Sequence, residues 1–86
     1  MREDLAADVA RVLAALLDAK AWFRHGVTDG QLSEGTHLPL HRLVVARREA
    51  EAQGLVERQG LSSDHPIMML TPVGVARARI MRQSAL

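Results

Sequence analysis

The polar side chains best suited to contact a ligand lie between residues 36 and 48. Arg42 and Arg48 carry guanidinium groups that can bind guanine O6 and N7 or a backbone phosphate, and His41 can donate a hydrogen bond to either. Thr36 and His37 come just before them, at the expected start of the same helix. Because duplex DNA offers these acceptors, the segment predicts a DNA-reading surface.

Further candidates surround this segment. Val45 could pack on a thymine methyl group. Backbone amides at a helix start, near Thr28, can bind an anion. Arg58, Ser62 and Ser63 could hold a phosphate from a neighbouring loop. The complete set predicted to contact DNA is Thr28, Thr36, His37, Pro39, His41, Arg42, Val45, Arg48, Arg58, Ser62 and Ser63.

The same arginines can also be read as ordinary solvated charges. Glu49 stands among them and would repel phosphate, and the formal net charge of the chain is only +1. Arg47 and Glu51 lie four residues apart and could form an ion pair, either at the rim of the core or between subunits. These features favour an alternative in which the surface binds a protein.

A metal site and a catalytic site have less support. His37 and His41 have a spacing of one helical turn, which can chelate a metal, but no third ligand is near in sequence, so we predict no metal. The chain has no cysteine, no H-E-x-x-H and no glycine-rich phosphate loop. We therefore predict that the protein is not an enzyme and needs no cofactor.

Composition indicates a single small domain over residues 1–86. With 48% hydrophobic and 24% charged residues, the chain can build a core and is expected to be soluble and cytoplasmic, with no membrane span. A domain of this size is marginally stable alone, and a homodimer would bury more surface. The arginines of residues 72–86, which carry no acidic partner, are expected to form a solvated face.

Apolar spacing and capping signals predict four helices and a hairpin. Residues 2–23 have apolar side chains three and four apart, indicating an amphipathic helix that Gly26 would end. It would be about 30 Å long, more than the core needs, so part of its stripe would contact a second subunit. The residues predicted at that dimer interface are Leu5, Val9, Val12, Leu16 and Ile80.

The middle of the chain predicts a helix-turn-helix. Thr28 and Gln31 form a capping box that opens a short helix over 28–34, which Gly35 would end. A longer helix follows over 38–53 and closes at Gly54. Its apolar face is predicted to hold Leu40, Leu43, Val44, Ala46 and Ala50. A hairpin over 55–70 and a last helix over 72–83, capped by Thr71, complete the chain.

Two pentapeptides in this order resemble a known family. Gly54-Leu55-Val56-Glu57-Arg58 follows the long helix, and Leu70-Thr71-Pro72-Val73-Gly74 follows the hairpin. Together they resemble the MarR (multiple-antibiotic-resistance regulator) family of winged helix repressors over about residues 27–82. The resemblance implies a dimer built from the first and last helices, a recognition helix over 38–52 in the major groove, and a wing over 59–66.

The sequence departs from that family in three places. The chain is short, so the long C-terminal dimerisation helix is reduced to one segment. The usual arginine at the wing tip is replaced by Ser62, Ser63, Asp64 and His65, and Arg47 occupies a position that is normally apolar.

The predicted fold class is α+β and mostly helical: a winged helix-turn-helix with a three-helix core, a two-stranded wing and a C-terminal helix. The predicted function is sequence-specific binding of double-stranded DNA by a homodimeric transcriptional regulator that acts as a repressor. Any small-molecule effector is unknown. The alternative is a winged helix that binds a protein partner and has no specific affinity for DNA.

Overall fold

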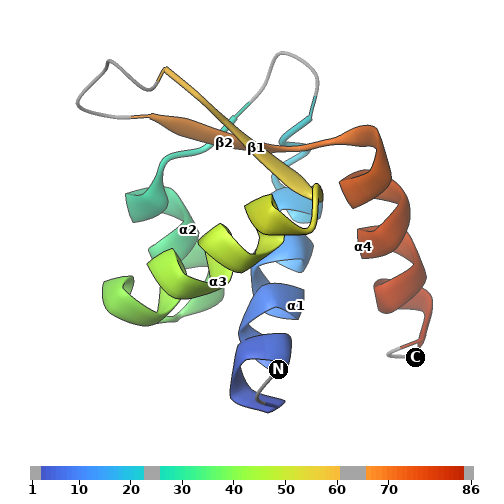
Figure 1. Ribbon diagram of the computed structural model, residues 1–86, viewed down its shortest axis with the longest axis horizontal. Helices are drawn as coiled ribbons and strands as arrows, with labels where there is room; N and C mark the ends of the chain where they lie inside the picture. Colours follow the sequence, from blue (N-terminus) through green and yellow to red (C-terminus); the bar gives the residue numbers. More distant parts are fainter. Residues whose placement is uncertain (1–2, 23–25, 61–65, 85–86) are drawn as a thin grey trace.

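The winged helix order predicted from the sequence is present in the computed structural model, which describes residues 3–22, 26–60 and 66–84. Helix α1 (Glu3–Asp18) is followed by α2 (Asp29–Thr36) and α3 (Leu40–Ala52). Strands β1 (Val56–Gln59) and β2 (Ile67–Leu70) form an antiparallel hairpin, and α4 (Pro72–Ser84) closes the chain. Figure 1 shows the hairpin above the helices, with α4 on the side of α1 away from α2. The predicted fold class is confirmed.

Helix α1 ends at Asp18, so the predicted helix over 2–23 is too long. Lys20 adopts a left-handed backbone with φ of 54°. The amide of Lys20 donates to the carbonyl of Leu17 (3.1 Å) and that of Ala21 to the carbonyl of Leu16 (2.9 Å). This is a Schellman closure, which usually uses glycine at the left-handed position. A lysine there gave no stop signal in the sequence.

Residues on either side of positions 23–25 cover the second edge of β2. The amide of Leu70 donates to the carbonyl of Ala21 (2.7 Å), and Val27 exchanges hydrogen bonds with Met68 (2.7 and 3.0 Å). Gly26 lies next to Val27, where an added Cβ would come within 2.9 Å of Ile67. Gly26 therefore permits close packing against the strand, and the prediction that it ends α1 is wrong.

The core lies where α1, α2, α3 and the hairpin meet. Val12 and Leu16 of α1 have no exposed surface, and Val9 is 5% exposed. These three side chains pack inside their own chain, so they are not available at a subunit interface, and that part of the predicted interface is corrected. The physical reason is that the apolar stripe of α1 is covered by α3 and α4 of the same chain.

The helix-turn-helix begins with the predicted cap. Thr28 Oγ1 accepts from the amide of Gln31 (3.2 Å), and Gln31 Oε1 accepts from the amide of Thr28 (2.9 Å). The helix ends at Thr36, one residue beyond the predicted Gly35, because His37 takes the left-handed conformation (φ 60°) and its amide donates to the carbonyl of Ser33. The turn into α3 is therefore made by a histidine rather than a glycine.

Helix α3 buries one face as expected, with two exceptions. Leu43, Ala46 and Ala50 are fully buried, but Leu40, predicted with them, is 55% exposed at the first turn. Arg47 is buried in its place, with 4% of its surface exposed. A charged side chain thus occupies part of the inner face of α3.

The base of the wing joins the two signature pentapeptides. The hydroxyl of Thr71 donates to the carbonyl of Gly54 (2.7 Å), and the amide of Thr71 donates to the carbonyl of Leu55 (3.0 Å). Thr71 Oγ1 also accepts from the amide of Gly74 (3.0 Å) and so caps α4. A Cβ on Gly74 would lie 1.8 Å from the carbonyl oxygen of Leu55. The two pentapeptides therefore contact each other directly at the base of the wing, through backbone groups and the Thr71 hydroxyl.

Among the helices of the described ranges, none combines the length and the apolar character that crossing a membrane requires.

Candidate nucleic-acid interface

The outer face of α3 presents a ridge of exposed side chains. His41, Val45 and Arg48 share one side of the helix at about 100° per residue, and all three are exposed, Val45 by 54%. Arg48 has no carboxylate within ion-pair distance among the described residues. We call His41, Val45 and Arg48 the reading ridge. It combines a hydrogen-bonding ring, an apolar surface and a cation, which suits base edges and phosphates.

Two further predicted residues lie at the start of this ridge. Pro39 is exposed and forms the N-cap of α3, where it leaves no side-chain cap. His37 is exposed in the left-handed turn between α2 and α3. A left-handed backbone is costly for a residue other than glycine. The His37 ring is exposed beside the start of the reading ridge.

Arg42 lies at the edge of α3 that faces α1 and binds Asp8. Its Nε donates to Asp8 Oδ2 (3.0 Å) and its Nη2 to Asp8 Oδ1 (2.7 Å). The Asp8 side chain is 7% exposed, whereas that of Arg42 is 47% exposed. The hydrogen bond to Asp8, reinforced by its negative charge, raises the pKa of the Arg42 guanidinium above its ordinary value. Arg42 is therefore a fixed cation, and α1 supplies its counter-charge.

Arg47 joins α2 to α3 from inside the domain. Its Nε donates to Asp29 Oδ1 at the start of α2 (2.9 Å), and its Nη1 donates to Glu51 Oε1 (2.7 Å). The Arg47 side chain is 5% exposed and each carboxylate is 26% exposed. The predicted pairing of Arg47 with Glu51 is present. It is an internal contact of this chain.

The wing strand adds one cation near this pair. Arg58 of β1 is exposed and its Nε lies 3.9 Å from Glu51 Oε1. Ser62 and Ser63, the predicted phosphate contacts of the wing tip, lie outside the described residues. Arg58 is therefore the predicted wing contact whose position the structure gives.

Two threonines predicted to contact DNA are engaged inside the protein. Thr36 is 5% exposed, and its hydroxyl donates to the carbonyl of Leu32 (2.6 Å) and accepts from the amide of Leu38 (3.3 Å). Its prediction as a DNA contact is wrong, because a buried, satisfied hydroxyl stabilises the turn instead. Thr28 is half-buried, with its oxygen occupied by the capping box. A phosphate at Thr28 would therefore have to bind beside the capping box, because the side-chain oxygen already accepts a hydrogen bond.

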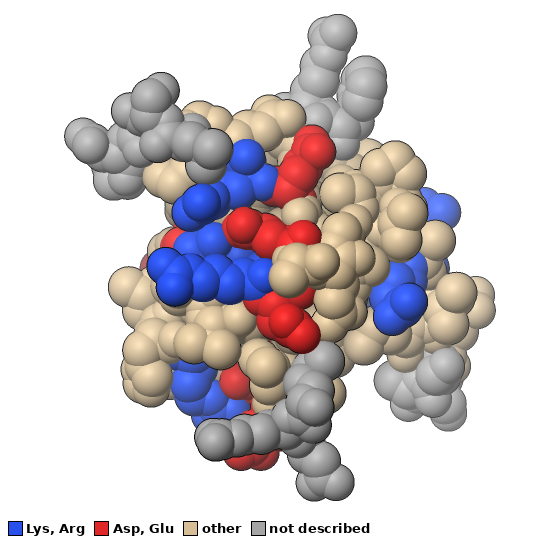
Figure 2. Space-filling model, viewed as in Figure 1, with Lys and Arg blue, Asp and Glu red and all other residues tan. Residues whose placement is uncertain are grey.

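The charges on this side of the molecule are mixed. Figure 2 shows blue and red side chains next to each other over α3 and the wing strands. Arg47 and Arg58 stand beside Glu51, and the Glu49 carboxylate accepts a hydrogen bond from Gln53 Nε2 (3.3 Å). This face is therefore not a uniformly basic patch, and any DNA contact would be local to a few side chains.

Sequence reasoning missed Asp8 and Asp29, the acidic partners of Arg42 and Arg47. Asp8 is 5% exposed and lies in the apolar stripe of α1, three residues after Leu5 and four before Val12. An acid inside an apolar stripe needs a partner. The position of Asp8 in the apolar stripe was therefore a sign in the sequence that it has a partner, although only the fold shows that this partner is Arg42.

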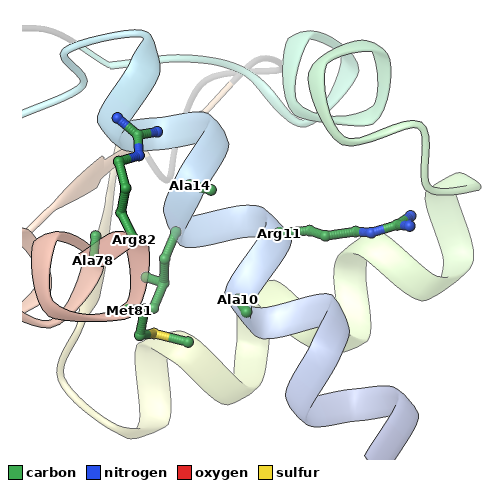
Figure 3. A pocket seen from close by; sticks show the side chains of 7 residues that line it. Ala10, Arg11, Ala14, Ala78, Met81 and Arg82 are labelled. Carbon is green, nitrogen blue, oxygen red and sulfur yellow. The ribbon is translucent and has the colours of Figure 1, made fainter. Parts of the chain in front are cut away.

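The remaining predicted interface residues lie on two helices. Leu5 is half-buried on α1, and Ile80 is 59% exposed on α4, where Val73 is 61% exposed. A groove of about 290 Å³ lies between these helices, with Ala10, Ala14, Ala78 and Met81 in its lining. In Figure 3, Arg11 and Arg82 at this groove point in different directions.

Within the described ranges, no cluster of three or more His, Asp or Glu side chains could hold a metal.

Comparison with known proteins identifies the fold. No family model and no curated protein matches the sequence. A candidate DNA-binding protein from Ralstonia eutropha has a solved structure with a TM-score of 0.76 and 20% identity, covering 87% of this chain and 94% of that one. A MarR-family transcriptional regulator from Silicibacter pomeroyi gives 0.71 and 26%, covering 95% of this chain and 56% of that one. The fold is that of MarR-type winged helix regulators.

MepR, a transcription regulator of the multidrug efflux pump MepA in Staphylococcus aureus, gives a TM-score of 0.75 at 14% identity, covering 88% of this chain and 54% of MepR. A complex of MepR with DNA is similar as well, with a TM-score of 0.63. The chain thus spans little more than half the length of MepR and of the Silicibacter pomeroyi regulator. Its length is closer to that of the Ralstonia protein.

Proposed function

We propose that this protein is a sequence-specific duplex-DNA-binding transcriptional regulator that acts as a homodimer and represses by blocking access to its site. The observation that carries the proposal is the reading ridge, exposed on the second helix of a helix-turn-helix. In this motif the second helix enters the major groove with its N-terminal residues against the base edges. His37 and Pro39 at the helix start, and Arg42 at its edge, extend the ridge.

The division of roles follows from the contacts. Arg48 has no carboxylate partner in the part of the chain that the structure describes, so it can bind a phosphate or guanine. Val45 offers only an apolar surface and suits a thymine methyl group. Arg58 is placed to contact the backbone from the wing. With few cations available, we expect a modest salt dependence, because each phosphate contact releases about one counterion.

The homodimer would use the outer face of α4. Val73 and Ile80 are seven residues apart on the same side of this helix and are mostly exposed. Two such faces would bury these side chains and set two reading ridges at a fixed spacing, as a two-fold operator requires. Ile80→Asp should give a monomer by light scattering and reduce affinity for two half-sites. The control for oligomeric state is Arg79→Asp, an exposed position that lies about 100° from Ile80 around the same helix.

The test of DNA binding is fluorescence anisotropy with random and genomic duplexes across a salt series. Arg48→Ala should weaken binding and reduce the salt slope by about one. Arg79→Ala removes the same charge from the exposed surface of α4 and should leave the affinity unchanged. Equal effects of the two substitutions would show that binding is non-specific and that the reading ridge is not involved.

The second candidate function is a winged helix that binds a protein. The observation in its favour is the neutralisation of Arg42 and Arg47 by carboxylates, together with the exposed Leu40 and Val45. An absence of DNA binding even at low salt would favour this candidate and contradict the first.

A further inference from the structure

The ion pair between Arg42 and Asp8 leaves part of the guanidinium unused. An arginine has five N–H donors in a planar fork. Asp8 takes the donor on Nε and one of the two on Nη2. Among the described residues, the second donor on Nη2 and both on Nη1 have no partner. One donor from each of these two nitrogens forms a second, parallel pair at the end of the side chain.

The burial of the two side chains indicates that this arrangement persists. The Asp8 carboxylate is 7% exposed and sits in the apolar stripe of α1, whereas Arg42 is 47% exposed. Moving Arg42 away would strand a buried carboxylate without a partner, which is costly. Arg42 can therefore accept a new ligand through its outer donors while it keeps Asp8 on its inner edge.

The outer pair of donors matches one base. Guanine presents two acceptors, N7 and O6, in the major groove, whereas adenine presents N7 beside the N6 donor. Arg42 belongs to the first turn of α3, the part of a recognition helix that reaches base edges. A guanidinium already fixed in plane loses less entropy on forming two further hydrogen bonds.

We propose that Asp8 of α1 is a specificity-determining positioning residue that holds Arg42 so that its outer donor pair reads a guanine. The proposal rests on the proposed DNA binding and adds to it a named base and a residue outside the helix-turn-helix. Asp8 itself does not touch DNA. Its effect is on sequence preference, which distinguishes it from a residue that only stabilises the fold.

The experiment starts with selection of duplexes by the wild-type protein and measures binding to every single-base change of the selected site. Wild-type protein should prefer one guanine in each half-site by about 10- to 100-fold. Asp8→Asn, which keeps the size of the side chain, should reduce that preference to less than about 3-fold, while the other positions change little. Arg42→Lys keeps the charge and loses the fork, and should lose the same guanine preference.

A matched control is present at the C-terminal end of α1. Asp18 binds Arg82 of α4 through an exposed ion pair that also joins two helices. Asp18→Asn should keep the full guanine preference. Thermal unfolding of each variant distinguishes loss of the fold from loss of sequence preference. If Asp8→Asn does not fold, Asp8→Ala, which removes the carboxylate that holds Arg42, takes its place with the same loss of preference expected.

Three results would overturn the inference. A folded Asp8 variant with undiminished guanine preference would show that Asp8 is only structural. Tighter binding to all sequences by Asp8→Asn, with a steeper salt slope and unchanged preference, would show that Asp8 competes with phosphate for Arg42. A guanine preference that survives Arg42→Lys would assign it to another residue. Failure of the wild-type protein to bind any duplex would instead reject the proposed function.

Discussion

The two ends of α3 are held by different kinds of contact. Near its start and along its inner face, α3 is fixed by charged side chains, with Arg42 on Asp8 and Arg47 on Asp29 and Glu51. Beyond its end, the chain is fixed by backbone groups, with Gly54 and Leu55 against Thr71 and the close approach of Gly74. We call the part of α3 held by Arg42 and Arg47 the reading end, and the junction of Gly54 and Leu55 with Thr71 and Gly74 the wing end. Long charged side chains thus fix the position of the reading end, and close contact between main-chain groups fixes that of the wing end.

This difference decides which substitutions each end accepts. A pair of long side chains can shift or exchange partners, because each has several rotatable bonds and several hydrogen-bonding atoms. A backbone contact that leaves no room for a Cβ cannot adjust in this way. We therefore expect the wing end to be intolerant of added volume and the reading end to be sensitive to removal of charge.

The largest effect is expected from Gly74→Ala. The new Cβ would lie 1.8 Å from the carbonyl oxygen of Leu55, so α4 must move away from the end of α3. We expect a loss of about 3 kcal/mol in the free energy of unfolding, measured by urea denaturation. Gly30→Ala is the control, since its Cβ meets only Thr28 Oγ1 at 3.8 Å. It should stabilise α2 by about 0.5–1 kcal/mol, and equal losses in both would contradict the steric argument.

Arg47→Ala should cost less, about 2 kcal/mol, because it removes two charge-assisted hydrogen bonds and leaves Asp29 and Glu51 partly able to bind water. The measurement is thermal unfolding at neutral pH, in which each kcal/mol corresponds to roughly 4–8 °C in Tm. Arg48→Ala, at the next and exposed position, should stay within about 0.5 kcal/mol. A similar Tm for both variants would show that the internal ion pairs do not hold α3.

Thr71→Ala tests the polar part of the wing end. It removes both the hydroxyl that donates to Gly54 and the cap that accepts from Gly74, and should cost about 1 kcal/mol. Thr71→Ser keeps the hydroxyl and should recover most of the stability by the same denaturation assay. If Ser and Ala were equally destabilising, the lost methyl group rather than the cap would explain the effect.

The smallest effect is expected at the turn before α3. His37→Gly should raise the unfolding free energy by about 0.5 kcal/mol, because glycine adopts the left-handed backbone more easily. Lys20→Gly relieves the same conformation at the end of α1 and is the control for stability. We expect only His37→Gly to weaken DNA binding in the anisotropy assay. Unchanged binding by both variants would leave His37 as a structural residue.

The sequence predicted this fold well because its signals are local. The capping box of Thr28, the glycine after α3 and the Thr71-Pro72 start of α4 each depend on a few neighbouring residues, and each element begins within a residue or two of its predicted position. The end of α1 was missed, because a left-handed lysine has no such local pattern. Leu40 was wrongly placed on the buried face of α3. Arg47 was predicted at the rim of the core, and its full burial was missed because it depends on Asp29 of α2, which the helix periodicity does not describe.

The candidate site was predicted less completely, because its chemistry depends on contacts between distant residues. Residue type and helix periodicity identified the reading ridge of His41, Val45 and Arg48. They could not show that Arg42 binds Asp8, 34 residues earlier, since that pairing depends on how α1 crosses α3. Thr36 looked available for the same reason, although the turn between the helices buries it.

The covering of both edges of β2 affects the tendency of the protein to aggregate at high concentration. β2 is bordered by β1 on one side and by Ala21, Trp22 and Val27 on the other, so the free strand edge of the described wing belongs to β1. Three of the four residues of that strand, Glu57, Arg58 and Gln59, are polar and exposed. Charged side chains along an open edge discourage strand addition from another molecule. Replacing them with β-branched apolar residues would therefore turn the wing into a seed for edge-to-edge aggregation.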